Sequence, residues 1–428
     1  MLSLLVAAAI QTAWVVPAPH VLVFSKTTGF RHDSIPSAIA AIKKLGTEHG
    51  FQVDATEDSA VFNDENLKKY DLVCFASTTG DILDGGQQKA LEHFVEGGKG
   101  WVGIHAASDT EYDWPWYSEL VGAYFKSHPP GGQRVHVKIE NRGNPSTANL
   151  PRFWVRPDEW YDWKANPRGK VTVLASLDES FYRPEPQDHP IAWCHWQGKG
   201  RAWYTEMGHF KEAYAEKEFV EHIYGGLMWA AQGSAKLAGA QDLTWKSTDG
   251  WQSTTEGLSN TQTERAPLVT KDEYGDCHLH AEFKIAKGTN AGVYLQSRYE
   301  LLINDSQDVP QEKLRFTDCG GIFRRFDEKT KIGYGGTTPL VNAFLGRDEW
   351  NVYDIVFRAP RFRGGSKIED ARFVEVRLNG IVVQKDQPVT GPTQAATYSN
   401  EKPTGPLALQ FGKGPIVYRN MWIKKLSL

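Results

Sequence analysis

The 428-residue sequence has few cysteines, hardly any excess charge and no long hydrophobic run beyond its first residues. Its 4 cysteines are too few for a disulfide scaffold, although Cys277 and Cys319 share one half of the chain and their pairing stays open. The formal net charge of −4 gives no reason to expect binding to nucleic acid or to an acidic membrane. We therefore expect neither nucleic acid nor a membrane among its partners, and the oligomeric state stays open.

The composition is ordinary for a globular protein except for its many glycines and tryptophans. The length predicts about two or three domains. The 40 glycines and 15 tryptophans suit a turn-rich β domain with a sugar-stacking surface. Tryptophan is, however, more often simply part of a core.

Residues 1–18 resemble a secretory signal peptide. An apolar run at residues 2–10 is too short to cross a bilayer, and small residues follow it. The basic segment that usually precedes such a run is missing. We expect a periplasmic or secreted protein.

Residues 20–233 alternate short apolar segments with amphipathic ones. Wholly apolar strands are typical of a parallel sheet that is buried on both faces. Such alternation predicts an α/β doubly wound domain. We expect strands at residues 21–24, 72–75 and 101–104, and helices at residues 36–46, 87–95 and 216–230.

A small, polar segment at residues 234–243 is the expected linker. Beyond it the helical periodicity disappears, and strand patterns recur with turn signals such as Asn379-Gly380 and Gly414-Pro415 between them. Residues 244–428 are therefore predicted to form an antiparallel β-sandwich of the jelly-roll type.

Several chemically active side chains follow the predicted strands of the first domain or lie in nearby loops. Ligands of open α/β sheets bind at the carboxyl ends of the strands. A single histidine there is more often a hydrogen-bonded loop residue, but a converging set indicates a metal site or an acid–base site. The candidates are His32, His105, Asp109, His128, Glu159 and His209.

Four short segments around these residues resemble the trehalose-utilisation (ThuA-like) family. They are Gly-Ile-His-Ala at 103–106, Ser-His-Pro at 127–129, Asp-Glu-Trp-Tyr at 158–161 and Gly-His at 208–209. The resemblance implies a fold like that of the class I glutamine amidotransferases, which is flavodoxin-like. It also implies a pocket for oxidised sugars. His105 stands where the amidotransferases carry cysteine, which excludes thiolate chemistry at that position. A divalent metal ion stays an option, and we expect no nucleotide cofactor.

Residues 290–305 separate into two rows when read with period two, which indicates one strand or two strands joined by a short bend. One row is apolar and suits a core. The other suits a ligand with many hydroxyl groups, although an ordinary wet sheet face with a cross-strand ion pair is an equal alternative. The apolar row is Val293, Leu295, Tyr299, Leu301 and Ile303. The polar row is Tyr294, Gln296, Arg298, Glu300 and Asn304.

Residues 245–428 resemble the 3-keto-disaccharide hydrolase family along nearly their whole length. The matching segments include residues 290–305, Cys-Gly-Gly-Ile at 319–322, residues 349–354 and Arg-Asn-Met-Trp at 419–422. The resemblance implies a concanavalin-like jelly roll. It also implies a substrate that is an oxidised sugar or glycoside with a ketone at C3 of a glucosyl unit.

Such a ketone acidifies the proton at C2, so that one base can start the elimination of the C1 aglycone, and water can then add. This chemistry needs a base, donors for the enolate oxygen and a sugar-binding surface. Glu300 is the candidate base or metal ligand, and Arg298 and Arg419 are the candidate oxyanion partners. The candidates for substrate binding are Asn290, Tyr294, Gln296 and Asp305.

Two alternatives stay open. An ordinary glycoside hydrolase needs two carboxyl groups about 5–9 Å apart. Glu300 and Asp305 differ by an odd number, so a regular strand places them on opposite faces unless a bulge intervenes. The other alternative is a carbohydrate-binding protein with a non-catalytic jelly roll. Relatives often carry an Asp-His pair near residues 409–412, where this chain has no histidine.

Overall fold

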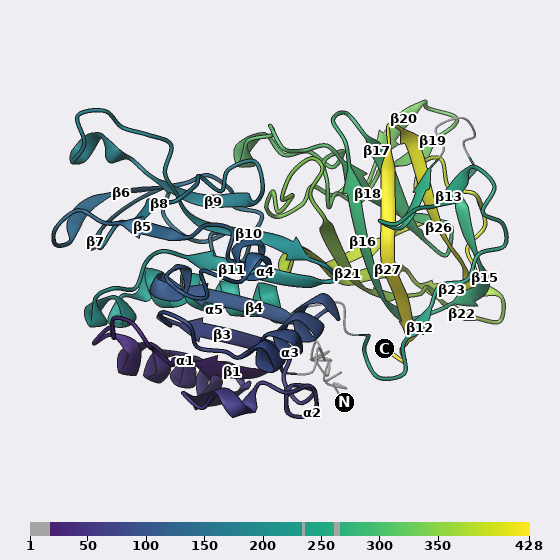
Figure 1. Ribbon diagram of the computed structural model, residues 1–428. Helices are drawn as coiled ribbons and strands as arrows, with labels where there is room; N and C mark the ends of the chain where they lie inside the picture. The colour runs from purple at the N-terminus through teal and green to yellow at the C-terminus, as the bar shows by residue number, and fades with distance from the viewer. Residues whose placement is uncertain (1–17, 233–235, 261–265) are drawn as a thin grey trace, which may run out of the picture.

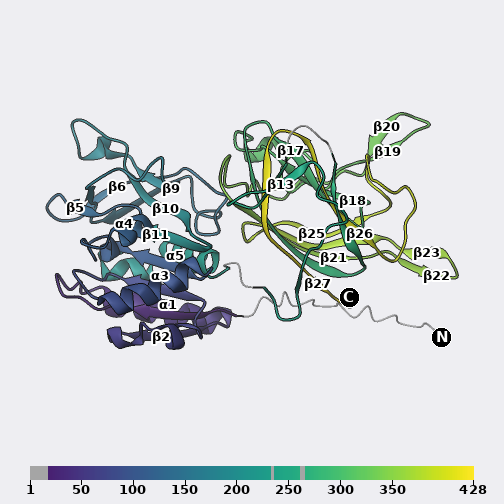
Figure 2. The ribbon, with the colours of Figure 1, turned by 45° about the vertical axis from the view of Figure 1, so that its right-hand side comes forward.

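A computed structural model describes residues 18–232, 236–260 and 266–428. The signal peptide expected at residues 1–18 lies, apart from Ala18, outside the described residues. The chain forms two domains that lie side by side, an α/β domain followed by a β-sandwich (Figures 1 and 2). No helix in the described ranges is both long and apolar enough to span a membrane.

The first domain is built on a nine-stranded sheet with the order β2-β1-β3-β4-β11-β10-β9-β6-β7. Strands β2 to β11 in this order run parallel, and the strands from β10 to β7 pair antiparallel. The α/β prediction is confirmed, with an antiparallel extension on one side. The bounds are β1 (His20–Phe24), β2 (Gln52–Thr56), β3 (Leu72–Ala76), β4 (Gly100–Ile104), β6 (Gln133–Ile139), β7 (Phe153–Asp158), β9 (Thr172–Leu177), β10 (Pro190–Gln197) and β11 (Gly200–Thr205).

Helices cover both faces of this sheet. Helices α1 and α5 share one apolar cluster with the strands, while α2, α3 and α4 share another. Local sequence sets the helix ends: Asp84 and Gln87 form a capping box at the start of α3, and Gly50 ends α1 at a φ of 76°. The bounds are α1 (Ile35–His49), α2 (Asp64–Leu67), α3 (Gly85–Glu96), α4 (Pro115–Val121) and α5 (Lys217–Ala231).

The second domain packs two antiparallel sheets around one apolar core, as predicted. The larger sheet follows the order β13-β14-β27-β16-β21-β24-β25 with β12 beside β27, and the smaller sheet follows β15-β26-β17-β18. Strand β12 lies within the expected linker segment. The bounds are β12 (Gln241–Asp242), β13 (Trp251–Ser253), β14 (Leu258–Asn260), β15 (Leu268–Tyr274), β16 (Cys277–Ile285), β17 (Asn290–Leu295), β18 (Tyr299–Asn304), β21 (Asn351–Arg358), β24 (Ala371–Leu378), β25 (Ile381–Val389), β26 (Gly405–Lys413) and β27 (Ile416–Lys425).

Short two-stranded ribbons decorate both domains. They are β5 (Phe125–Ser127) with β8 (Asp162–Trp163), β19 (Arg325–Asp327) with β20 (Ile332–Tyr334), and β22 (Arg361–Arg363) with β23 (Ser366–Glu369). All four cysteines are buried and free, so Cys277 and Cys319 do not pair. Burial raises the pKa of the Cys319 thiol to about 11.

The two domains meet through buried contacts. Leu345 of the second domain belongs to the apolar core of the first, and its carbonyl oxygen accepts a hydrogen bond of 2.6 Å from Asn141 Nδ2. The Arg419 guanidinium lies between the rings of Trp196, at 4.2 Å, and Trp350, at 3.9 Å. Because these contacts combine apolar packing with a doubly stacked cation, they hold the domains in a fixed relation.

Candidate functional site

Four of the predicted residues of the first domain come together at one edge of the sheet, each of them after the end of a strand. His32 follows β1, His105 follows β4, His209 follows β11, and Glu159 follows β7. One ligand atom from each of the four lies within 4.8 Å of the others. We name these four residues the His/Glu cluster. Its convergence reflects a general property of such sheets, whose strand ends share one edge.

The local backbone fixes His105 in one orientation. Its φ of 51° places it in a sharp turn directly after β4, where the side chain is fully buried. Its Nδ1 lies 2.7 Å from the carbonyl oxygen of Glu206, and since a carbonyl only accepts, Nδ1 carries the hydrogen. Its Nε2 faces the cluster, 2.8 Å from the Tyr161 hydroxyl and 3.5 Å from Glu159 Oε2. Metal-binding histidines are commonly oriented in this way, by donating one ring N–H to a backbone carbonyl oxygen.

Glu159 is the anionic centre of the cluster and is only 8% exposed. Its Oε2 lies 3.1 Å from His209 Nδ1 and 3.5 Å from His105 Nε2, and its Oε1 lies 3.2 Å from His128 Nδ1. Burial opposes ionisation, but the hydrogen bonds and charges of His105 and His209 outweigh it, and the pKa of Glu159 falls well below its usual range. The carboxylate thus stays charged at any ordinary pH.

His32 is the member of the cluster with spare capacity. It is 6% exposed, and its buried Nδ1 has no hydrogen-bond partner among the described residues. Burial, reinforced by the neighbouring His105 and His209, lowers the pKa of His32 to about 3. A neutral imidazole with an unpaired nitrogen beside a carboxylate has the donor chemistry of a Zn²⁺ site, which takes nitrogen and oxygen ligands.

The two remaining predicted residues of this domain lie outside the cluster. His128 reaches Glu159 from the half-exposed rim of the site. Asp109 accepts a hydrogen bond of 2.7 Å from the Tyr112 hydroxyl and contributes no ligand atom to the cluster. Burial raises the pKa of Asp109. Its position directly after the turn at His105 had suggested a residue of the pocket, but its side chain bonds to Tyr112 in the loop that follows.

Sequence reasoning missed the residues that support the cluster from behind. His189 Nδ1 lies 2.7 Å from Glu179 Oε1, and its Nε2 lies 3.3 Å from Glu206 Oε2. Burial opposes protonation of this imidazole, but the two carboxylates raise the pKa of His189 to about 9. Tyr161 could have been noticed, because it lies two residues after Glu159. His189 carries no such signal, since an antiparallel strand brings it in.

In the second domain, β17 and β18 form a hairpin that confirms the apolar row read from the sequence, whereas Gln296 and Arg298 of the polar row lie in the turn. The chain turns at Gln296 and Ser297, whose φ values are 55° and 53°. The register pairs Tyr294 with Glu300 and Val293 with Leu301. All five residues of the apolar row belong to the core of the sandwich. The polar pair Tyr294 and Glu300 therefore lies on the outer face of the smaller sheet.

Glu300 lines a small pocket on this outer face. The pocket has a volume of about 190 Å³, and its polar lining residues include Asn290, Tyr294, Asn304 and Gln410. The Glu300 side chain lies over Gly292, where an added Cβ would come within 2.5 Å of its Oε1. We name this the Glu300 pocket.

Burial dominates the acid–base behaviour of Glu300, which is 6% exposed. Burial raises the pKa of Glu300 to about 7, although a hydrogen bond from Tyr294 lowers it. Among the described residues, no arginine or lysine lines the pocket. The carboxyl group is thus poised to exchange a proton near neutral pH.

The predicted arginine partners of Glu300 are contradicted by the structure. Arg298 lies beyond the strand, in the turn, where its Nη1 donates to the carbonyl oxygen of Gln296 at 2.8 Å and its guanidinium stacks on Tyr398. Arg419 lies on β27 of the opposite sheet, and its Nε donates to Glu282 Oε2 at 2.7 Å. Neither cation is placed to stabilise charge at Glu300.

Two of the predicted substrate-binding residues serve the architecture instead. Gln296 Nε2 donates to the carbonyl oxygens of Tyr274 and Pro403, at 3.1 and 3.0 Å. Asp305 accepts hydrogen bonds of 2.8 Å from Arg347 Nε and 2.7 Å from the backbone N–H of Gly288. Asp305 is therefore engaged outside the Glu300 pocket, which leaves no second carboxylate from this pair for an ordinary glycosidase.

Asn290 and Tyr294 do line the pocket, and so does Gln410, which sequence reasoning passed over. Gln410 pairs with Gly292 across β26 and β17. It stands in the segment where a histidine was expected, so an amide occupies that part of the wall.

Comparisons with known proteins follow this division of the chain. Residues 20–230 match the family model described as trehalose utilisation, ThuA, and residues 236–424 match the 3-keto-alpha-glucoside-1,2-lyase-like domain. No curated protein matches the chain.

Solved structures resemble each half separately. A ThuA-like protein of Bacteroides uniformis is 28% identical, covers 51% of this chain and 94% of its own, and has a TM-score of 0.46. A candidate glycosyl hydrolase of Parabacteroides distasonis is 24% identical, covers 44% of this chain and 84% of its own, and has a TM-score of 0.34.

Proposed function

Since the chain joins a ThuA domain to a 3-keto-alpha-glucoside-1,2-lyase-like domain, we propose that it cleaves 3-keto-glycosides, with Glu300 as the base. Glu300 takes the proton from C2, and the electron pair of that C–H bond forms an enolate with the C3 carbonyl. The enolate then re-forms the ketone, a C1–C2 double bond appears, and the aglycone leaves from C1. The departing oxygen takes up a proton, and water can add across the new double bond.

The burial of Glu300 and its raised pKa are the observation on which this proposal rests. An efficient general base has a pKa close to the working pH. Burial gives Glu300 a pKa of about 7, and no lysine or arginine in the described pocket lining lowers it. A base of this kind removes an acidified C–H proton more readily than an ordinary carboxylate, whose pKa is near 4.

The neighbours of Glu300 supply the remaining requirements. The Tyr294 hydroxyl, which bonds to Glu300, offers a donor for a developing enolate oxygen. Asn290, Asn304 and Gln410 offer amide groups to sugar hydroxyls. At about 190 Å³ the pocket is smaller than sites for drug-sized ligands, which suits one sugar ring.

Aglycone release tests this function directly. The substrate is 4-nitrophenyl glucoside oxidised at C3, and the unoxidised glucoside is the control. We expect release only from the oxidised compound, with a loss of at least about 100-fold in Glu300→Gln, the scale of a missing acid–base group. The matched control is Glu312→Gln, which changes an exposed carboxylate. Equal turnover of both glucosides, or full activity in Glu300→Gln, contradicts the proposal.

A second proposed function belongs to the first domain, where the His/Glu cluster is suited to a divalent metal ion. Three imidazoles and one carboxylate converge, and the unpartnered His32 Nδ1 shows capacity that no described residue uses. A bound Zn²⁺ would supply Lewis-acid polarisation of a sugar carbonyl. In this chain Glu206 holds the tautomer of His105, and Glu159 provides the negative charge that offsets the cation.

Metal analysis of the purified protein tests the cluster. We expect about one Zn²⁺ per chain after dialysis against Zn²⁺, and much less in His209→Ala. His93→Ala is the matched control, because His93 is an exposed histidine outside the cluster. Unchanged metal content in His209→Ala contradicts the proposal. Aglycone release in the presence of a chelator separates the two centres, because the Glu300 reaction as proposed uses no metal.

A further inference from the structure

A large cavity lies between the domains, away from both candidate centres. Its volume is about 1120 Å³, and α5, the end of α1 and the larger sheet of the sandwich line it. We name it the interdomain cavity. We propose that it binds a neutral oligosaccharide.

The position of the interdomain cavity makes it a separate site. Pro19 and Asp71, which line it, directly precede β1 and β3, whereas the His/Glu cluster follows the opposite ends of the parallel strands. On the sandwich side it is lined by residues of β16, β21 and β27, which belong to the larger sheet, while Glu300 belongs to the smaller one. One ligand therefore cannot occupy this cavity and either centre through the same contacts.

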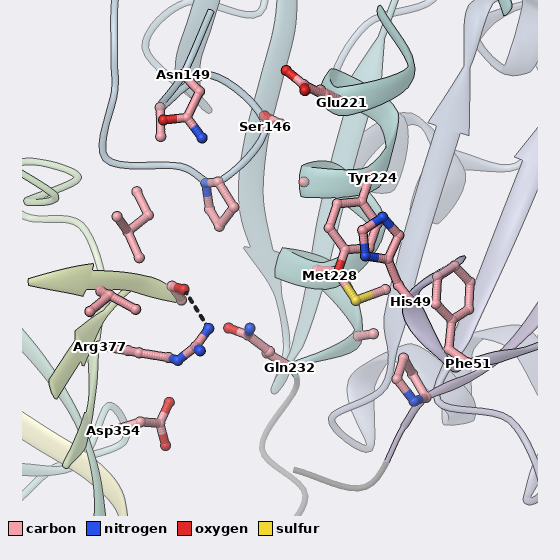
Figure 3. Close-up of a pocket in the computed structure, with 18 of the residues that line it drawn as sticks. His49, Phe51, Ser146, Asn149, Glu221, Tyr224, Met228, Gln232, Asp354 and Arg377 are labelled. Atoms are coloured by element: carbon pink, nitrogen blue, oxygen red, sulfur yellow. Dashed lines mark hydrogen bonds between the residues drawn. The ribbon is translucent and has the colours of Figure 1, made fainter. Parts of the chain in front are cut away.

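One wall of the cavity is formed by rings and apolar groups. The His49 ring stacks on Tyr224 with centroids 3.9 Å apart, and Phe51 lies parallel to Tyr224 at 6.4 Å. Met228 follows one turn later on α5 (Figure 3). These rings and the thioether give the wall apolar contacts that suit the C–H groups of a sugar ring.

The facing wall is polar and comes from the second domain and the end of α5. Arg377 and Asp354 lie on neighbouring strands, and Gln232 approaches them from the first domain (Figure 3). Asp354 is held by His280 Nδ1 at 2.8 Å and His278 Nε2 at 3.3 Å. Charged and amide groups in fixed positions recognise the hydroxyl rim of a saccharide, as small-molecule sites do with a few placed polar groups.

The charges of the residues that line the interdomain cavity indicate which class of ligand it binds. Arg377 Nε lies 2.7 Å from Glu375 Oε1, and Asp354 is paired with His280 and His278. The lining also includes Glu221, Asp71 and Lys236, so neither sign of charge dominates. The Trp422 side chain lines the cavity, is 3% exposed, and has an indole N–H with no partner among the described residues. A hydroxyl-rich ligand without charge fits such a lining, because it demands no counter-charge.

Size and rigidity also favour an oligosaccharide over a single sugar. The volume exceeds that of typical drug-sized sites and leaves room for several rings. The walls belong to different domains, and the Arg419 stack between Trp196 and Trp350 fixes the two domains together. The cavity is therefore preformed, which reduces the entropic cost of binding.

Calorimetric titration of the full chain with maltotetraose and cellotetraose tests the proposal, with glucose and a tetra-galacturonate for comparison. We expect one site for at least one neutral tetrasaccharide, weaker binding of glucose, and no preference for the charged probe. Tyr224→Ala and Met228→Trp, which remove the ring wall and fill the cavity, should each weaken binding at least tenfold. Tyr334→Ala, on the exposed β19–β20 ribbon, is the matched control.

Binding is also measured in Glu300→Gln, so that the proposal for the interdomain cavity is tested separately from the proposal for the Glu300 pocket. Binding that survives Glu300→Gln but is lost in Met228→Trp supports the interdomain cavity whatever the fate of the elimination chemistry. Absence of binding to both neutral probes, tighter binding of the galacturonate, or binding unaffected by Tyr224→Ala and Met228→Trp overturns it. Circular dichroism of each variant establishes that a loss of binding is not a loss of folding.

Discussion

Replacing Glu300 with glutamine should stabilise the protein at alkaline pH while abolishing its base. The folded protein holds the Glu300 proton up to a pKa of about 7, whereas the ordinary value is 4.5. Between these values the folded state binds more protons than the unfolded state, so stability falls as the pH rises and levels off above pH 7. Glutamine carries no charge, and its amide oxygen still accepts the Tyr294 hydrogen bond.

The size of the effect follows from the pKa difference. At 1.36 kcal/mol per pKa unit, keeping the buried carboxylate charged costs about 3 kcal/mol above pH 7. The glutamine variant is free of this cost, so its advantage grows from near zero at pH 4.5 to about 3 kcal/mol at pH 8. For a domain of this size, such a difference corresponds to roughly 5–10 °C in Tm.

Scanning calorimetry of the full chain at pH 5, 6, 7 and 8 measures this difference. The transition that contains the sandwich is identified as the one that Glu300→Gln shifts, and Glu312→Gln provides the exposed-carboxylate control. A stability difference that is constant across the pH series, or one that favours wild type at pH 8, refutes the assignment of a buried, unpaired carboxyl group.

Three further predictions concern other parts of the chain. Gly292→Ala should lower aglycone release at least tenfold, because its Cβ would come within 2.5 Å of Glu300 Oε1, while Gly85→Ala, with no atom within 4 Å, should leave it unchanged. Arg419→Ala should lower the free energy of unfolding by about 3 kcal/mol in urea titrations, since it removes the arginine partner of the buried Glu282 carboxylate. Iodoacetamide should modify none of the 4 cysteines in the native protein and all of them in urea, because burial raises the pKa of each thiol.

The sequence predicts well those features that depend only on which face of a single strand is buried. The rows of residues 290–305 follow from a sheet with one face in a core, which forces Val293 and Leu301 inward and Tyr294 and Glu300 outward. The same physics makes strands such as β3 and β4 wholly apolar, since helices cover both faces of their sheet. These predictions need no knowledge of distant partners.

The sequence predictions that failed are those that depend on contacts between segments far apart in the chain. The spacing of Arg298 in the sequence fits the polar row, but Arg298 lies in the turn. Gln296 and Ser297 just before it adopt left-handed backbone conformations, so the strand alternation does not hold there. Arg419 lies in a segment with the right family pattern, yet nothing local tells which sheet β27 joins. Gln410 was overlooked for the same reason, because its approach to Glu300 depends on the pairing of β26 with β17. A periplasmic or secreted location stays a prediction.

Glu300 and Glu159 are buried carboxylates whose pKa values are shifted in opposite directions, and this contrast separates their roles. Burial alone raises the pKa of Glu300 to about 7, whereas the histidines around Glu159 overcome burial and hold its pKa well below the usual range. A carboxylate as acidic as Glu159 is a poor proton acceptor at neutral pH but a good partner for a cation. Pairs of acids with such divergent environments commonly divide the tasks of a reaction. Our proposals therefore assign proton abstraction to the Glu300 pocket and cation binding to the His/Glu cluster, and exchanging these roles would require each site to lose the environment that defines it.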